Sequence, residues 1–178
     1  IYLKENHRLL LEDLVKGALI KSGNDAAYAI GEGIAGSESL FLALMNKKAT
    51  LIGAKTSNFK NTNGLPDPEH ISSAYDLAII ARYCMSNKSF AGIVAKKEEQ
   101  IKILPDENRF LKNTNKLLLN YPFATGIKTG TTVAAGQCLI ASANKNGKCI
   151  ITVVLRSFNR YNDTISLLDF AFSDDCNR

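Results

Sequence analysis

Two consecutive residues, Asn146 and Gly147, lie between two apolar runs and constrain the fold more than any other feature of this sequence. Asn-Gly is a preferred pair for the two-residue turn of a β-hairpin, because both central residues of that turn adopt positive φ. The turn predicts that residues 137–143 pair with residues 149–155 as antiparallel strands, and residues 124–131 form a further strand-like run before them. The back of the chain is therefore predicted to be an antiparallel sheet.

The front of the chain has helical periodicity instead. Apolar residues recur at helical spacing over residues 11–20, and a second helix is expected over residues 25–35, with Ser22-Gly23-Asn24 as the corner between the two. The other expected elements are a helix capped by Ser37 that ends at Gly53, a loop over 54–72 of the kind that packs around a site, a helix that begins at Ser73, short extended or mixed segments over 98–104 and 109–119, and a closing helix over 163–172. The fold class is therefore α+β, in one domain with a helical part over about 9–95 and a sheet-rich part over about 96–178.

The composition allows a sizeable core and gives no sign of a membrane span. The chain has 178 residues, of which 46% are hydrophobic, and no apolar run approaches the roughly 18–20 residues that a span needs. The net charge is +5, but the lysines are scattered and alternate with acidic residues, as in Lys96-Lys97-Glu98-Glu99. A solvated surface explains this pattern better than a stripe that binds nucleic acid. Residues 1–20 lack the order of a signal peptide, so either the protein is cytoplasmic or its export signal lies outside this chain.

The cysteines and histidines indicate neither a metal site nor a disulfide. No two of the four cysteines form a C-x-x-C pair, and with two histidines they make no convincing zinc set: Cys84, Cys138, Cys149 and Cys176, with His7 and His70. The hairpin sets Cys149 opposite Asn144 and Cys138 opposite Leu155, so these two cysteines cannot face each other. The cysteines are expected to be small buried hydrophobic residues, and no metal or cofactor is predicted.

Two short polar motifs carry the chemistry. Residues 126–131 place a lysine, a hydroxyl and a glycine in succession on an extended segment, which can pair its backbone with a peptide because glycine keeps the edge open. Lys128 supplies a positive charge for a carboxylate, and the Thr129 hydroxyl can hydrogen-bond the same group. Taken alone, a surface lysine with a turn glycine explains this motif more simply, and any helix corner explains Ser22-Gly23-Asn24.

Together and in this order, Ser22-Gly23-Asn24 and Lys128-Thr129-Gly130 resemble the second and third motifs of the penicillin-recognising serine acyltransferases, whose first motif is S-x-x-K. Segments along nearly the whole chain resemble one group of these, the low-molecular-mass penicillin-binding proteins that are D-alanyl-D-alanine carboxypeptidases: Asp13–Gly17, Ser22–Ala27, Asn63–Pro68, Ala74–Ala78, Asn113–Leu118 and Gly126–Gly130. That family trims the terminal D-alanine from peptidoglycan stem peptides outside the cytoplasmic membrane.

The resemblance implies a β-lactamase-like fold, in which an antiparallel sheet is flanked by a helical region and the site lies in the cleft between them. It implies that Ser22 hydrogen-bonds between two lysines and passes a proton towards the leaving amine, while Asn24 holds the amide of the substrate. Lys128 binds the terminal carboxylate. We therefore expect the motif side chains to converge on one cleft: Ser22, Asn24, Lys128 and Thr129.

The resemblance also implies substrate-binding residues at the end of the same extended segment. Thr129 binds the terminal carboxylate beside Gly130, and the backbone N–H of Thr131 is one donor of the oxyanion hole. Arg160 precedes the leucine pair at 167–168 as an arginine does in the family, which makes it a second contact for the carboxylate, pointing towards the same cleft. The alternative for Arg160 is a surface arginine at the start of a helix.

The nucleophile of this family is not where its motif should be. In the family, S-x-x-K begins a helix some tens of residues before Ser-Gly-Asn, and residues 1–21 contain no serine. Two S-x-x-K matches occur, Ser57 to Lys60 in a Gly- and Asn-rich loop and Ser142 to Lys145 at the end of a strand. Catalysis needs the lysine one helical turn after the serine, and both matches follow Ser-Gly-Asn when they should precede it. Neither is expected to be the nucleophile.

The chain is therefore expected to be an N-terminally incomplete carboxypeptidase domain, without the part that carries the nucleophile, the base lysine and one strand of the sheet in the family. Three explanations stay open: a piece of a longer protein, a naturally shortened inactive homologue, and a protein completed by a separate N-terminal fragment. The leading function is a serine-type D-alanyl-D-alanine carboxypeptidase that works through an acyl-enzyme. The alternative is a non-catalytic module that binds wall peptides.

The resemblance also sets the expected partners and location. The partners are a peptidoglycan stem peptide ending in D-Ala-D-Ala and β-lactams, and no nucleic acid, since no basic run is interleaved with aromatic residues. The protein is expected on the outer side of the cytoplasmic membrane, with any export signal or membrane anchor outside this chain. The 178 residues alone are expected to form no penicillin adduct.

Overall fold

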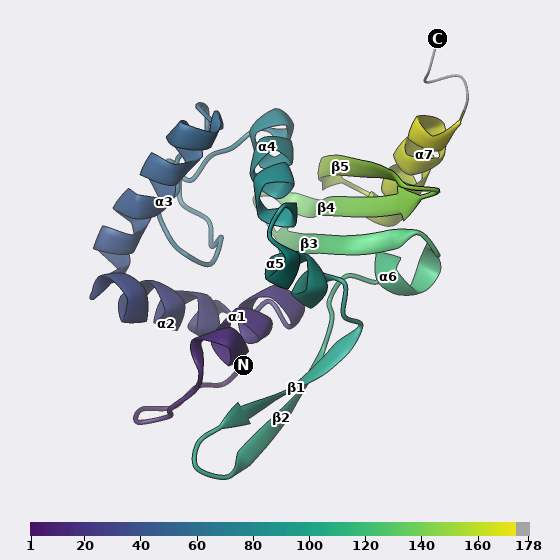
Figure 1. Ribbon diagram of the computed structural model, residues 1–178. Coiled ribbons are helices and arrows are strands. Elements are labelled where there is room, and N and C mark those ends of the chain that lie inside the picture. Colours follow the sequence, from purple (N-terminus) through teal and green to yellow (C-terminus); the bar gives the residue numbers. More distant parts are fainter. Residues whose placement is uncertain (174–178) are drawn as a thin grey trace.

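The structure is a computed structural model that describes residues 1–173, and it places helices before and after a run of strands (Figure 1). The elements in chain order are α1 (Leu11–Ile20), α2 (Asn24–Ala35), α3 (Glu38–Ile52), α4 (Ala74–Met85), α5 (Lys88–Val94), β1 (Glu98–Ile103), β2 (Glu107–Lys112), α6 (Leu117–Asn120), β3 (Ala124–Thr132), β4 (Gly136–Lys145), β5 (Lys148–Ser157) and α7 (Arg160–Phe172). Within residues 1–173, no helix combines the length and the apolar character that crossing a membrane requires.

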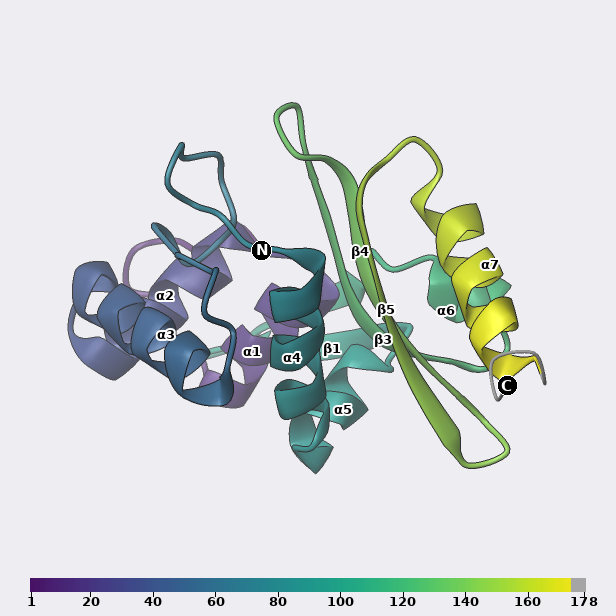
Figure 2. The same cartoon turned by 90° about the horizontal axis from the view of Figure 1, so that it is seen from above.

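The central sheet has the order β3-β4-β5, with both pairs antiparallel and helices on both faces (Figure 2). On one face, α6 and α7 bury Leu139 of β4 against Leu168 of α7. On the other face, α4 and α5 bury Val94 against Ile127 of β3. The helices α1, α2 and α3 lie beyond α4 and α5, on the side away from α7 (Figure 2). The predicted α+β class, an antiparallel sheet flanked by helices, is confirmed.

The hairpin that the sequence predicts at Asn146 and Gly147 joins β4 to β5. Both residues have positive φ, 53° and 82°, as the two-residue turn requires. Asn144 pairs with Cys149 across the turn, which is the predicted register. The strands extend one residue further at their starts and two residues further at their ends than the sequence predicts, because the ladder continues for as long as backbone groups find partners.

The expectation that the cysteines are buried is wrong for Cys149, which is exposed, while Cys84 and Cys138 are half-buried. Cys149 lies at the second residue pair from the turn of the hairpin, whose tip projects beyond the helices that cover the sheet (Figure 2). All three are free thiols, and Cys176 lies outside the described residues.

The helix boundaries in the first half follow the capping residues closely. The Ser37 hydroxyl accepts a hydrogen bond from the N–H of Leu40, and the Ser73 hydroxyl accepts one from the N–H of Asp76. Gly53 ends α3 with a φ of 98°, a left-handed conformation that residues with a Cβ adopt at a cost. The predicted helices over this part are confirmed to within one residue at their starts.

Three features were not predicted from the sequence. The helix α5 is seven residues long, too short to display a helical period, and it is capped by the Asn87 side chain. The segment 109–119 divides into the end of β2 and the start of the short helix α6, and α7 begins at Arg160 rather than at 163. Packing of Ile93 and Val94 into the core, rather than local periodicity, stabilises α5.

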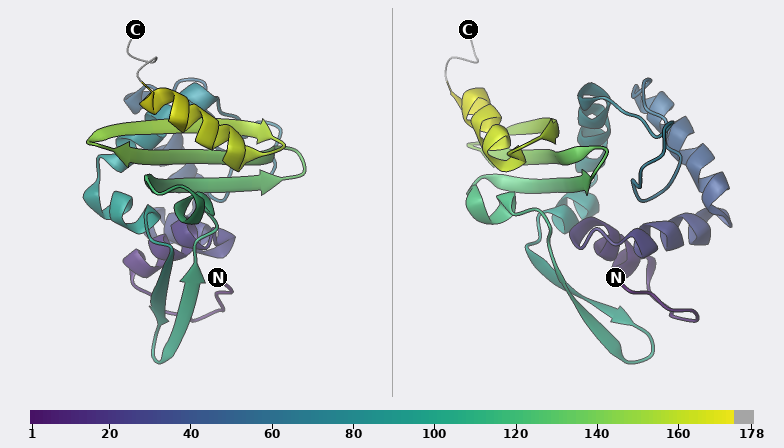
Figure 3. Two further views of the ribbon diagram at one scale, coloured as in Figure 1. Left: turned by 90° about the vertical axis from the view of Figure 1, so that its right-hand side faces the viewer. Right: turned by 180° about the vertical axis from the view of Figure 1, so that it is seen from behind.

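The strands β1 and β2 form a separate two-stranded hairpin that projects from the body of the molecule (Figure 3). Its inner side chains, Ile101 and Leu111, are buried against Ile20 at the end of α1. The short segment over residues 113–116, between β2 and α6, then returns the chain from this hairpin to the central sheet (Figure 1).

Side chains of the helices hold the loop over residues 54–72 in place. The Asn46 side chain donates a hydrogen bond to the carbonyl of Phe59 and accepts one from its N–H. The Glu38 carboxylate accepts hydrogen bonds from the N–H and the hydroxyl of Thr62. Asp76 accepts three hydrogen bonds, two from Thr56 and one from Ser57. Burial raises the pKa of the Asp76 carboxyl, but hydrogen bonds from Thr56 and Ser57 outweigh it and hold the pKa below its ordinary value.

Candidate active site

Ser22 stands at the corner between α1 and α2, where the sequence predicts a break between helices. Its φ is 60°, in the left-handed region that few residues with a side chain occupy. The Gly23 N–H bonds the carbonyl of Gly17 and so closes the end of α1. Strained backbone of this kind collects at functional sites, where the surrounding structure holds a side chain in one direction. The Ser22 side chain is thus presented at an exposed corner.

The strain at Ser22 gives a testable difference between two substitutions. Ser22→Gly is expected to be more stable than Ser22→Ala by about 0.5–1 kcal/mol, because glycine removes the Cβ from a left-handed position at some cost in chain entropy. Both variants lose the hydroxyl equally, so the difference isolates the backbone. Urea unfolding of the two variants measures it, and equal midpoints would show that Ser22 is not strained.

Lys128, in the middle of β3, reaches across to this corner. Its Nζ donates a hydrogen bond to Ser22 Oγ over 2.6 Å and another to the carbonyl of Thr129 over 2.8 Å. Burial lowers the pKa of Lys128 to about 8, and the positive charge of Arg160 adds to that effect. The structure therefore brings the two motifs into direct contact, through a lysine whose pKa is about 8.

Thr129 faces away from the Lys128 ammonium, because successive side chains of a strand point to opposite faces. Its hydroxyl shares a hydrogen bond of 2.8 Å with the hydroxyl of Thr114, and the residue is only 8% exposed. The hydroxyl that lies exposed at the end of the Lys-Thr-Gly strand is that of Thr131. The four motif side chains therefore do not all point into one space.

Arg160, the first residue of α7, bends back onto the end of β3. One of its Nη atoms donates to the carbonyl of Gly130 over 2.9 Å and to Thr131 Oγ1 over 2.7 Å, with a longer bond of 3.3 Å to the carbonyl of Cys138. Its guanidinium also lies over the Tyr161 ring, 5.2 Å from the centroid. Arg160 thus contacts the same strand that carries Lys128, at its end, and is not turned to the far side of α7.

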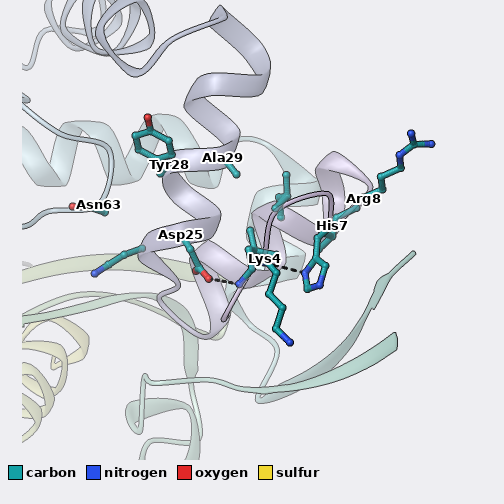
Figure 4. Close-up of a pocket in the computed structure, with 11 residues that line it drawn as sticks. Lys4, His7, Arg8, Asp25, Tyr28, Ala29 and Asn63 are labelled. Atoms are coloured by element: carbon teal, nitrogen blue, oxygen red, sulfur yellow. Dashed lines mark hydrogen bonds between the residues drawn. The ribbon is translucent and has the colours of Figure 1, made fainter. Parts of the chain in front are cut away.

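Asn24, the first residue of α2, lines a neighbouring cavity of about 640 Å³ rather than the Ser22–Lys128 contact. Figure 4 shows Tyr28 and Asn63 on one side of this cavity and His7 on the other. Neither Ser22 nor Lys128 lines it. Within residues 1–173, no group of three His, Cys, Asp or Glu side chains could hold a metal ion here or elsewhere.

The two downstream S-x-x-K matches have no catalytic arrangement. Ser57 donates to Asp76 while Lys60 pairs with Glu69. Ser142 shares a hydrogen bond with Thr125, and Lys145 lies over the ring of Phe123. In neither case does the lysine contact the serine hydroxyl, as the loop and strand positions predict.

Comparisons with known proteins test the family resemblance drawn from the sequence. Residues 1–159 match the family model described as D-alanyl-D-alanine carboxypeptidase. D-alanyl-D-alanine carboxypeptidase DacF of Bacillus subtilis is 40% identical over 176 residues, which cover 97% of this chain and 45% of that protein. DacC of Escherichia coli is 35% identical over 178 residues, covering 97% of this chain and 43% of that protein. The chain thus spans less than half the length of these curated relatives.

Solved structures extend the likeness to three dimensions. The DD-transpeptidase of Streptomyces K15 aligns with a TM-score of 0.88 and 28% identity, over 96% of this chain and 71% of that one. The D-alanyl-D-alanine carboxypeptidase DacD from Francisella tularensis aligns with a TM-score of 0.87 and 29% identity, over 97% of this chain and 54% of that one. The resemblance drawn from the sequence motifs, and the fold that it implies, are confirmed.

Proposed function

This chain belongs to the D-alanyl-D-alanine carboxypeptidase family, and we propose on that premise that it carries the proton-relay and carboxylate-binding part of the active site of a serine-type peptidase. The substrate is a peptidoglycan stem peptide ending in D-Ala-D-Ala, and β-lactams acylate the same site. The enzyme acts on the outer side of the cytoplasmic membrane. The observation that carries this proposal is the 2.6 Å hydrogen bond between Lys128 Nζ and Ser22 Oγ.

The proposed reaction has two steps. The serine of an S-x-x-K segment that is not among these 178 residues attacks the penultimate D-alanine carbonyl, forming an ester and releasing D-alanine as its amine. Water then attacks the ester and frees the shortened peptide with a new carboxylate. In the first step the attacking serine loses its hydroxyl proton and the departing nitrogen gains one. Ser22 relays this proton to the nitrogen while Lys128 holds the Ser22 hydroxyl in position.

Electrostatics at the end of β3 support the carboxylate site. The substrate ends in a free carboxylate, and Lys128 and Arg160 place two positive charges along the same strand. Within the described residues, β3 is the edge of its sheet, so a peptide can add to it as a further strand. A peptide held there lies close to the N–H of Thr131, our candidate donor to the oxyanion.

The geometry modifies the proposed roles of two residues. Because the Thr129 hydroxyl bonds Thr114, its contribution to carboxylate binding is secondary to that of the exposed Thr131 hydroxyl, which already bonds Arg160. Asn24 holds the substrate amide from the neighbouring cavity, beside the corner rather than at the Lys128 contact. Gly130 contributes its backbone, whose carbonyl orients Arg160.

The depressed pKa of Lys128 predicts an alkaline limb in the pH profile. The ammonium form donates to Ser22 and attracts the carboxylate, so the acylation rate constant is expected to fall as the pH rises through about 8. Arg160→Leu removes the positive charge that helps to lower this pKa, so the limb should move up towards the ordinary value of 10.5. The measurement is the second-order rate constant for β-lactam acylation against pH, which reports the free enzyme. Arg82→Leu, at an exposed position of α4, is the control and should leave the limb in place.

Labelling with a fluorescent penicillin tests the proposed function. We compare residues 1–178 with a protein extended at its N-terminus along the parent reading frame until it includes an S-x-x-K segment. Label is expected on the extended protein only, and replacing the serine of that segment by alanine should remove it. Label on neither protein would favour the inactive wall-binding homologue. Label on residues 1–178, mapped to Ser22, Ser57 or Ser142, would show that the excluded serines include a true nucleophile.

A further inference from the structure

We propose that Thr114 is a positioning residue that fixes the distance between Ser22 and Lys128, an inference that rests on the proposed function. Thr114 lies in the segment between β2 and α6, within the Asn-Thr-Asn sequence that the proposed reaction leaves without a role. This segment passes between the end of α1 and the strand β3 (Figure 1). Thr114 there contacts each of the three elements that carry the site.

Three different groups of Thr114 make the three contacts. Its backbone N–H donates to the carbonyl of Ile20 over 3.1 Å, two residues before Ser22. Its hydroxyl shares the 2.8 Å hydrogen bond with the hydroxyl of Thr129, the residue after Lys128. Its carbonyl accepts from the Tyr161 hydroxyl over 3.3 Å, next to Arg160. One residue thus connects the helix corner, the Lys-Thr-Gly strand and the start of α7.

The segment around Thr114 is itself held firmly. The Asn113 amide donates to the carbonyl of Lys96 over 2.8 Å, and its Oδ1 accepts from the N–H of Asn115 over 2.8 Å. The Asn115 side chain, which is buried, accepts from the N–H of Leu117 at the start of α6. Thr114 is therefore a fixed point and not part of a mobile loop.

A fixed point is needed because Ser22 and Lys128 belong to elements that are far apart in sequence. The corner could move relative to β3 by a rotation of α1 without breaking any bond within either element. The Thr114 hydroxyl resists this movement, since the Thr129 hydroxyl is buried and has this hydroxyl as its hydrogen-bond partner. A shift of about 1 Å between reacting groups can lower a rate by about 10²-fold.

The test compares Thr114→Val, Thr114→Ser and Thr125→Val in the N-terminally extended protein. Valine keeps the shape and the backbone contacts of Thr114 but removes the hydroxyl, whereas serine keeps the hydroxyl. Thr125 is a matched control. It lies on the same strand β3, its hydroxyl shares a hydrogen bond of the same 2.8 Å with that of the buried Ser142, and this bond involves neither Ser22 nor Lys128. Each valine variant leaves one buried hydroxyl without its hydrogen-bond partner, so the two variants should lose similar stability.

Thr114→Val is expected to lower the limiting rate of penicillin acylation by about 10- to 10²-fold, with the concentration for half-maximal rate changed by less than about threefold. Thr114→Ser should restore the rate to within about threefold, and Thr125→Val should stay within about twofold of the parent. Equal losses in both valine variants, or no rescue by serine, would overturn the positioning role.

A second readout separates this inference from the proposed function. The pKa of Lys128, followed by NMR of its side chain, should move from about 8 towards 10.5 in Thr114→Val and stay in place in Thr125→Val. This measurement needs no reaction. If the parent protein does not acylate but the pKa moves only in Thr114→Val, then the proposed function has failed while the positioning by Thr114 stands. An unmoved pKa in Thr114→Val would overturn the positioning itself.

Discussion

Replacing Lys128 by methionine is expected to lower the rate of penicillin acylation by about 10²–10³-fold, the usual effect of removing one preorganised donor from an active site. The protein for this test is the N-terminally extended one, which includes an S-x-x-K segment. Methionine keeps most of the length and apolar character of the lysine side chain. It removes the hydrogen bond to Ser22 Oγ and one of the two positive charges along β3. The measurement is the acylation rate constant with a labelled penicillin at neutral pH.

Stability measurements show whether the Lys128→Met effect is chemical. The buried ammonium of Lys128 is disfavoured, as its lowered pKa shows, so the variant is expected to unfold at the same or a higher urea concentration than the parent. Lys116→Met, at an exposed position before α6, is the control and should change neither the rate nor the stability. A Lys128→Met protein that is labelled at the parental rate would remove Lys128 from the mechanism.

Leu168→Ala is expected to destabilise the fold by about 2–5 kcal/mol, the usual cost of truncating a fully buried leucine. Leu168 is 0% exposed and packs from α7 onto β4, against Leu139 and Ala141. The loss should appear as a lower urea midpoint with an unchanged slope.

The neighbouring leucine provides a matched control for this prediction. Leu167 is 45% exposed, one position along the same helix, so Leu167→Ala should change the free energy of unfolding by less than about 0.5 kcal/mol. Comparable losses in both variants would mean that α7 does not pack on the sheet through Leu168. Because Arg160 begins the same helix, Leu168→Ala should also weaken β-lactam binding if α7 loosens.

The parts of the fold that could be predicted from the sequence are those determined by local chemistry. Asn146-Gly147 specifies a turn because of its φ requirements, and Ser37 and Ser73 begin helices because their hydroxyls accept free N–H groups. The helix α5 escaped prediction because its stability comes from the burial of Val94 against other elements. The exposure of Cys149 was not predicted because it depends on which elements cover the end of the strand, and the sequence of the strand does not specify those elements.

The candidate site divides in the same way. The sequence alone indicated the candidate site residues, because Ser22-Gly23-Asn24 and Lys128-Thr129-Gly130 are contiguous motifs whose residue types fix what they can donate or accept. Only the tertiary structure decided that Lys128 touches Ser22, that Thr129 turns to Thr114, and that Arg160 bends onto Thr131. These contacts join α1, β3, α7 and the segment before α6, and such distances depend on how the helices and the sheet pack, which no local pattern contains.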